Sequence, residues 1–391
     1  MKISLFTRLA GLVLAVGFFY SCGSTLNIDE LVENNQYTQA LNQLDEMIEK
    51  EADRPDLYLQ RAEISALAAQ EVEPEERAQF YVNTTNDFDS ADQYGATDSQ
   101  KSTIDSLRQQ YWKDEHNAGL QASEKETAEY ERAATHFSNA IILREEAISS
   151  YQNLAIAQFN QGKIEEAIES LLSALNYTED PPVSIYENLG YLHLEKGDAE
   201  EATHYYELAN KNLEEDLNVT FGLVNAYIAA GNSEQAVKFL EPLIKNNPQN
   251  ANLRNVYGTQ LYNITAEIVD DLKSAYRNND SVLVDQIKIE AEGMGEQAEN
   301  QLVEAYKRDT LNTEYLESLA VFYNNLGGQY FSLLDVAFEN DKEELNNKAL
   351  SLIDFSIEYY FKLVEAEPSN QEYNSKLDGL KNLKQNRTIP D

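Results

Sequence analysis

The chain has little cysteine, proline, histidine and tryptophan, and it has far fewer basic than acidic residues. Its 391 residues include one cysteine, eight prolines, four histidines and one tryptophan. The lone Cys22 excludes an intramolecular disulfide framework. Lys and Arg number 30 against 68 Asp and Glu, which gives a net charge of −38. Because such a surface repels phosphate backbones, we expect no nucleic-acid binding. The charge indicates a uniformly acidic, solvated surface, with attraction of a basic or cationic partner as the alternative.

The sequence also lacks the common patterns of a chemical site. Its histidines include no pair at i, i+4 spacing, and no second cysteine could complete a zinc site. It has no glycine-rich phosphate loop and no Gly-x-Ser-x-Gly elbow. The run from Asp87 to Asp92 begins like a calcium loop but lacks the required glycine and glutamate. We therefore predict no catalytic residue, no cofactor and no metal.

The most regular stretch of the chain runs from Ile148 to Asn250. It contains three similar turns, at Gly162–Ala167, Gly197–Ala202 and Gly231–Ala236, whose glycines lie 35 and 34 residues apart. A fixed period of this size is typical of solenoids, in which each helical hairpin buries its apolar face on the next. Glycine just past a helix ends it at little cost, because glycine tolerates the left-handed conformation.

The residues around these turns resemble the tetratricopeptide repeat family, whose period is 34 residues. That pattern alternates large packing residues with small ones at the contact between two helices. The matching residues are Tyr151, Leu154, Ala155, Gly162, Ala167, Leu171 and Ala174, then Tyr186, Leu189, Gly190, Gly197, Ala202, Tyr206 and Ala209, then Leu223, Tyr227, Gly231, Ala236, Leu240 and Leu243. His193 takes an aromatic position, while Thr220 and Val224 depart from the pattern. The resemblance implies an all-α fold, a right-handed superhelical solenoid of hairpins.

The repeat spacing lengthens after Asn250. Gly258 and Ala298 fit the two small positions of one repeat, but they lie 40 residues apart. The intervening sequence has helical periodicity and one strong turn signal, at 277–280. We therefore predict a hairpin whose arms are each about 14 residues longer than usual, which is roughly 21 Å. A second long hairpin would pair Ala320 with Ser356.

Shorter extensions occur on the N-terminal side. They would pair Ala62 with Thr84, and Ser106 with Ala133. The predicted organisation is a signal segment (1–22), a tether (23–27), N-terminal hairpins, some elongated (28–147), three regular repeats (148–250), two elongated hairpins (251–367), and a capping helix with its tail (368–391).

The N-terminus has the pattern of a targeting segment. A positively charged start precedes an apolar run, Leu9–Tyr20, that is short for a membrane span, and Ser21-Cys22-Gly23 follows. This resembles a bacterial lipoprotein signal, although Phe19 and Tyr20 depart from the usual residues before the cysteine. The resemblance implies acylation of Cys22 and anchoring in the bacterial envelope, as an outer-membrane lipoprotein that faces the periplasm or the cell surface. The alternative is a secretory signal cut after Gly23.

The family resemblance also implies a concave groove lined by the first helix of each repeat. The groove residues that it implies are Gln152, Ile156, Phe159, Asn160, Glu187, Tyr191, Leu194, Asn218, Phe221, Asn225, Ile228, Asn252, Asn255 and Tyr262. None of them is Lys or Arg, which disfavours the C-terminal carboxylates that chaperone-binding members clamp. Asparagine side chains both donate and accept hydrogen bonds, which suits an extended peptide backbone.

We therefore expect a non-catalytic protein–protein interaction scaffold, anchored to the membrane by its N-terminal lipid, that binds a peptide or protein in this groove. A glycan- or nutrient-capture lipoprotein and an outer-membrane assembly lipoprotein are the alternatives. The elongated hairpins are candidates for self-association.

Overall fold

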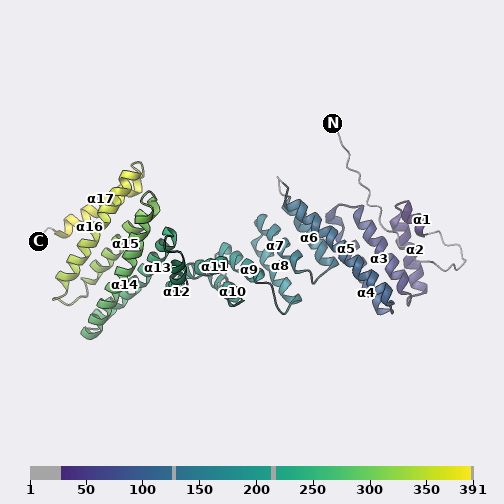
Figure 1. Cartoon of the computed structure of the whole chain (residues 1–391), viewed down its shortest axis with the longest axis horizontal. Coiled ribbons are helices and arrows are strands. Elements are labelled where there is room, and N and C mark those ends of the chain that lie inside the picture. Colours follow the sequence, from purple (N-terminus) through teal and green to yellow (C-terminus); the bar gives the residue numbers. More distant parts are fainter. Residues whose placement is uncertain (1–27, 126–128, 213–216, 389–391) are drawn as a thin grey trace. The chain divides into compact units, whose positions relative to one another are not determined.

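A computed structural model of the chain describes residues 28–125, 129–212 and 217–388. Within these ranges every regular element is a helix, and most consecutive helices pair into hairpins (Figure 1). The prediction of an all-α solenoid of helical hairpins, several of them elongated, is therefore confirmed. The predicted signal segment and tether, including Cys22, lie outside the described residues. The chain divides into two compact units, residues 1–161 and 162–391. This division falls inside the first regular repeat, and the domain boundaries expected from the sequence stay a prediction.

The N-terminal unit contains seven described α-helices and one 3-10 turn. They are α1 (Ile28–Glu33), α2 (Tyr37–Lys50), α3 (Pro55–Gln70), η1 (Pro74–Glu76), α4 (Ala78–Gln93), α5 (Asp98–Ser123), α6 (Tyr130–Leu143) and α7 (Ile148–Asn160). The C-terminal unit continues with α8 (Ile164–Ala174), η2 (Leu175–Tyr177), α9 (Val183–Lys196), α10 (Ala199–Asn212), α11 (Leu217–Ala229), α12 (Ser233–Asn246), α13 (Ala251–Arg277), α14 (Ser281–Arg308), α15 (Thr313–Leu333), α16 (Lys342–Ala366) and α17 (Gln371–Thr388).

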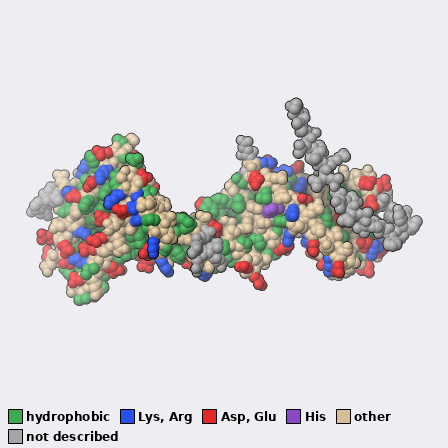
Figure 2. Space-filling view, viewed as in Figure 1, with side chains coloured by type: hydrophobic (Ala, Val, Ile, Leu, Met, Phe, Trp, Pro, Cys, Tyr) green, Lys and Arg blue, Asp and Glu red, His purple; other side chains and the backbone are tan. Residues whose placement is uncertain are grey.

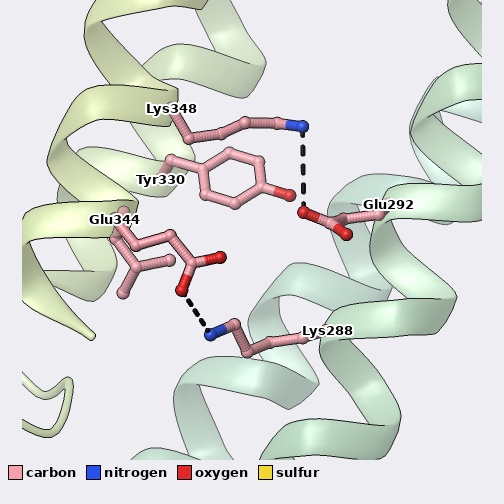
Figure 3. A pocket seen from close by; sticks show the side chains of 6 residues that line it. Lys288, Glu292, Tyr330, Glu344 and Lys348 are labelled. Atoms are coloured by element: carbon pink, nitrogen blue, oxygen red, sulfur yellow. Dashed lines mark hydrogen bonds and ion pairs between the residues drawn. The ribbon is translucent and has the colours of Figure 1, made fainter. Parts of the chain in front are cut away.

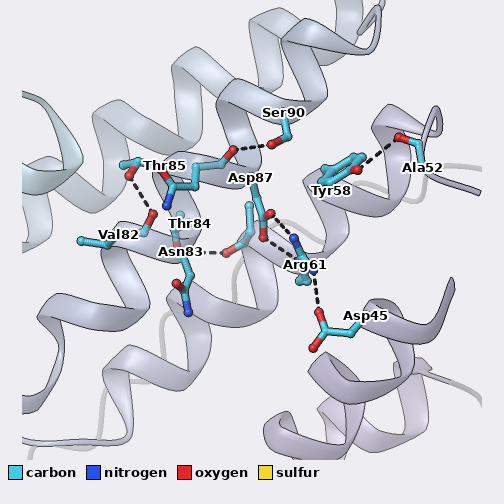
Figure 4. Close-up of polar contacts among 12 residues, drawn as sticks. Asp45, Ala52, Tyr58, Arg61, Val82, Asn83, Thr84, Thr85, Asp87 and Ser90 are labelled. Carbon is cyan, nitrogen blue, oxygen red and sulfur yellow. Dashed lines mark hydrogen bonds and ion pairs between the residues drawn. The ribbon is translucent and has the colours of Figure 1, made fainter. Parts of the chain in front are cut away.

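A half-buried arginine joins the first three long helices of the N-terminal unit. The guanidinium of Arg61 on α3 donates to both carboxylate oxygens of Asp87 on α4, at 3.0 and 2.6 Å, and to Asp45 on α2 at 2.5 Å (Figure 4). The side chain of Asp87 is only 4% exposed. The first aspartate of the calcium-like run is therefore the buried partner of an arginine that ties three helices together.

The helix contacts predicted from the repeat spacing can be followed atom by atom. The hydroxyl of Thr84 donates to the carbonyl of Ala62 at 3.3 Å, and that of Ser356 donates to the carbonyl of Ala320 at 2.8 Å. A methyl group added at Gly258 would lie 3.1 Å from the carbonyl oxygen of Ala298. These three pairings are confirmed.

The predicted pairing of Ser106 with Ala133 is wrong. Ser106 is exposed, and the close contact of this hairpin lies at Gly119, where an added methyl group would come within 2.7 Å of the Phe137 ring. The extra length of α5 therefore lies at its N-terminal end rather than beside the turn. A capping box at Thr97 starts the helix there: its side chain accepts from the Gln100 amide, and the Gln100 side chain bonds back to Thr97.

The long hairpin after Asn250 is formed by α13 and α14, of 27 and 28 residues. Its turn spans 278–280, where Asn279 adopts the left-handed conformation (φ 56°) and the Asp280 carboxylate accepts from the amide of Leu283. The turn signal and the elongation are both as predicted.

Two polar contacts connect this hairpin to the next one. Tyr276 donates to Asp341 at 2.7 Å, and Lys288 donates to Glu344 at 3.2 Å beside a small cavity (Figure 3).

Candidate functional site

One tyrosine ring sets the distance between α9 and α11 in the C-terminal unit. One edge of the Tyr206 ring, which α10 contributes, faces Gly190 on α9, and the opposite edge faces Gly222 on α11. A methyl group added at Gly190 would come within 2.6 Å of the ring, and one at Gly222 would come closer still. Because only glycine leaves room for the ring, Tyr206 lies against the backbones of both helices.

Two aromatic side chains are exposed next to this contact. Tyr191 directly follows Gly190, and Phe221 directly precedes Gly222. Tyr191 is 42% exposed and Phe221 is 37% exposed. Asn225, one helical turn after Phe221, is exposed as well. Adjacent helices therefore present aromatic and amide side chains to solvent on both sides of Tyr206.

Burial and nearby polar groups raise the pKa of Tyr206. Burial, followed by the nearby charge of Glu187 and the hydroxyl of Tyr191, raises the pKa of Tyr206 to about 12. Burial and Glu195 likewise raise the pKa of Tyr191. The surface around the exposed aromatic residues is therefore acidic, like the surface of the chain as a whole, on which acidic side chains are widely spread (Figure 2).

The other predicted groove residues of the C-terminal unit differ in exposure. Leu194 and Ile228 are half-buried against the small core around Tyr206 and Leu223. On α11 and α13, Asn218 and Asn252 are exposed.

Two groove residues on α13 are less accessible. Asn255 is only 6% exposed, and within the described chain its side-chain oxygen has no hydrogen-bond partner. Tyr262 is half-buried and packs edge-on against Phe322 at a centroid distance of 5.6 Å. The accessible part of the predicted groove in this unit therefore lies mainly on α9 and α11.

The remaining predicted groove residues belong to α7 in the N-terminal unit. Ile156 is 50% exposed, and Asn160 donates to its carbonyl at 2.8 Å. Gln152 and Phe159 are half-buried. These four residues share one helix of the N-terminal unit.

Sequence reasoning missed a buried charged cluster on α4, α5 and α6. The Glu115 side chain is 2% exposed. One of its oxygens accepts from the Tyr81 hydroxyl at 2.7 Å and from Arg77 at 2.8 Å, and the other lies 2.7 Å from Nδ1 of His136. Burial alone would raise the pKa of Glu115, but the hydrogen bonds from His136, Tyr81 and Arg77 outweigh burial and lower it. Glu115 is therefore held as a carboxylate that joins three helices.

The described residues contain no group of three or more His, Cys, Asp or Glu side chains that could hold a metal ion. In the same part of the chain, no helix is both long enough and apolar enough to cross a membrane.

Two family models, both of the tetratricopeptide repeat, match residues 153–213 and 193–258. Residues 153–258 therefore consist of tetratricopeptide repeats. The matched region takes in almost all of the three regular repeats and ends at Gly258, inside α13, the first helix of the long hairpin. None of the curated proteins matches this chain.

Solved structures of similar fold include three tetratricopeptide repeat proteins. One from Parabacteroides merdae is 14% identical, covers 69% of this chain and 98% of its own, and has a TM-score of 0.41. One from Bacteroides fragilis is 19% identical, with coverages of 61% and 99% and a TM-score of 0.29. YrrB, described as a TPR protein with an unusual peptide-binding site, is 18% identical, with coverages of 62% and 97% and a TM-score of 0.40.

Tetratricopeptide repeat proteins typically bind protein or peptide partners and are generally non-catalytic. The fold of this chain accordingly indicates a protein–protein interaction scaffold.

Proposed function

We propose that this protein is a lipid-anchored scaffold of the bacterial envelope that binds a peptide or protein segment across α9 and α11. The observation that carries this proposal is the exposure of Tyr191 and Phe221 beside the close contact made by Tyr206. Aromatic side chains with one accessible face are favoured anchors in protein interfaces, because they bury a large area at little entropic cost. The exposed Asn225 adds a group that can pair with a peptide backbone.

The acidic surface defines which segments fit. Glu187 and Glu195 lie close enough to Tyr206 and Tyr191, respectively, to raise the pKa values of these tyrosines. A bound segment that carries Lys or Arg next to an apolar residue would complement both the charge and the exposed rings. Long-range attraction from a chain of net charge −38 would also speed its association at low ionic strength.

The anchoring part of the proposal rests on the sequence around Cys22. A lone cysteine at the end of a short apolar run is the acylation site of lipoprotein signals, and two or more acyl chains give stable attachment to a membrane. The proposed location is the outer membrane, with the repeats in the periplasm or at the cell surface.

The test is cross-linking of the tagged protein in its native host, followed by mass spectrometry. The unchanged protein is compared with a Phe221→Ala/Asn225→Ala variant and with a matched control, Val282→Ala/Ile289→Ala. The control removes side chains that are 67% and 74% exposed on α14, far along the chain from α11. We expect the groove variant to lose a protein partner that the control retains. A partner kept by the groove variant contradicts the groove proposal, and loss of self-cross-links in the control alone would assign self-association to the long hairpin.

A Cys22→Ala variant tests the anchor separately. The unchanged protein should fractionate with membranes, and the variant should not. Co-fractionation of both forms would contradict lipid anchoring while leaving the groove result intact.

A further inference from the structure

The N-terminal unit contains a cavity next to the Glu115 cluster. Its volume is about 200 Å³, and it lies between the end of α3, the start of α4 and the middle of α5. The lining side chains are Gln70, Arg77, Tyr81, Tyr111, Asp114 and Glu115. A water molecule occupies about 30 Å³, so the cavity has room for several waters or for one short aliphatic side chain with a polar end.

Tyr111 is the polar group of this cavity that lacks a partner. Its side chain packs in the core of the unit and is only 7% exposed. Its hydroxyl makes no hydrogen bond to any residue that the structure describes, whereas the hydroxyl of Tyr81 donates to Glu115 at 2.7 Å. Tyr111 lines the cavity, and its hydroxyl oxygen is not among the fully buried polar atoms that lack a partner. The hydroxyl is therefore free to take a hydrogen-bond partner in the cavity.

The charges around the cavity determine what that partner can be. Arg77 is already used, because it donates to Glu115 at 2.8 Å and to the Val72 carbonyl at 3.1 Å. Asp114 and Glu63 have no ion-pair partner among the described residues. Both lie near Tyr111, since burial and then these two carboxylates raise its pKa. Burial raises the pKa of Glu63, and burial together with Glu115 raises that of Asp114.

This arrangement excludes several ligand classes. An anion would meet the carboxylate of Asp114, which lines the cavity and has no ion-pair partner among the described residues. A divalent cation would need clustered ligands, and no such group of His, Cys, Asp or Glu occurs in the described part of the chain. A small organic cation meets neither objection. An ammonium group has three donors and no acceptor, which matches the acceptors that Tyr111 and Asp114 offer at the cavity wall.

We propose that this cavity binds a primary ammonium group on an aliphatic stem, with Tyr111 and Asp114 as acceptors and the tyrosine rings against the stem. The ammonium can come from a free alkylamine or from a lysine side chain of a partner protein. The site is separate from the α9–α11 groove, so it extends the proposed function and does not depend on it.

The test is calorimetric titration of the full chain at low ionic strength with two probes. One is n-butylammonium, and the other is the peptide acetyl-Gly-Lys-Gly-amide, with a norleucine peptide of the same length as its neutral control. Tighter binding of the peptide would assign the site to a lysine side chain, and equal or tighter binding of butylammonium would assign it to a free amine. The norleucine peptide should not bind.

Tyr111→Phe is the decisive variant because it removes the hydroxyl and keeps the packed ring. Its matched control is Tyr58→Phe in the same unit. Tyr58 is also 7% exposed, but its hydroxyl donates to the Ala52 carbonyl and does not line the cavity (Figure 4). We expect Tyr111→Phe to weaken binding about tenfold, the value of one hydrogen bond to a charged group, and Tyr58→Phe to leave it unchanged. Asp114→Asn should weaken binding by a similar factor.

Two results would overturn this proposal. One is the absence of binding of both cationic probes to the unchanged protein. The other is equal affinity of the Tyr111→Phe and Tyr58→Phe variants. Neither result bears on the groove, since all these variants lie in the N-terminal unit.

Discussion

Replacement of Glu115 by glutamine should strongly destabilise the N-terminal unit. The substitution keeps the size of the side chain but removes its charge, and its new amide group faces Nδ1 of His136, 2.7 Å from the present oxygen. Removing one member of a buried ion pair costs about 3–5 kcal/mol, because the remaining charge stays desolvated. We expect about 3 kcal/mol, since the glutamine oxygen can still accept from Tyr81 and since Arg77 is 19% exposed.

The single tryptophan provides the assay. Trp112 lies on α5, three residues before Glu115, and its ring nitrogen donates to the Ser150 hydroxyl at 2.9 Å. Its fluorescence therefore reports the unfolding of the N-terminal unit alone. With a urea dependence of about 2 kcal/mol per molar, a loss of 3 kcal/mol lowers the urea midpoint by about 1.5 M.

The matched control is Glu131→Gln on α6, which neutralises an exposed glutamate in the same unit. A surface change of this kind should alter the stability by no more than about 0.5 kcal/mol. Hydrogen exchange provides a second measurement: amides of α4, α5 and α6 should exchange faster in the Glu115 variant, while those of α13 and α14 stay unchanged. Equal urea midpoints for the two variants would refute the conclusion that the buried carboxylate holds this unit together.

The other predictions concern the pH dependence of stability and the substitution of two glycines, one in a close contact and one in open space. Since the pKa of Glu115 is lowered in the folded state, its stabilising effect is complete above the pKa of an unfolded glutamate, about 4.3, and is lost as the pH falls through the lower folded value. The Trp112 urea midpoint of the unchanged protein should therefore fall more steeply with acidification than that of Glu115→Gln, and parallel curves would contradict this. Gly222→Ala should destabilise the α9–α11 region by about 1–3 kcal/mol through overpacking against Tyr206. Gly293→Ala, with nothing within 4 Å of the added methyl group, should stabilise α14 by up to about 1 kcal/mol. Circular dichroism in urea and local hydrogen exchange would measure both, and a stabilising Gly222→Ala would be evidence against the close contact.

The sequence predicted the fold well wherever packing is local and periodic. The glycines at 162, 197 and 231 all adopt the left-handed conformation, with φ of 76°, 84° and 71°, because the end of a helix demands it whatever its tertiary partners are. The pairing of Ala320 with Ser356 could be found because small residues at a helix contact leave a recognisable spacing.

The sequence could not show where an irregular hairpin carries its extra length. Ser106 and Gly119 are both small residues on α5, and periodicity alone fits either of them against the next helix; only the packing of Phe137 decides for Gly119. Glu115 was missed for a related reason. In the sequence, a glutamate between an aspartate and a histidine is interpreted as a solvated residue. Glu115 becomes buried only because residues 34 and 38 positions upstream fold against it.

The groove could be predicted from the sequence only in part. Repeat geometry indicated that Tyr191, Phe221 and Asn225 would be accessible, and they are exposed. Asn255, which the same geometry assigned to the groove, is buried, since it belongs to the first turns of the long helix α13, where the regular repeat pattern ends.

The small sequence separation of the contacts affects how the chain folds during its synthesis. The side-chain hydrogen bonds from Asn139 to the Pro74 carbonyl and from Tyr276 to Asp341 each span 65 positions of the sequence. A chain with such local contacts folds fast, and a growing chain folds from its N-terminal end. Each hairpin can therefore complete its contacts soon after the next one emerges from the ribosome. Little apolar surface then stays exposed while the remainder of the chain is being made.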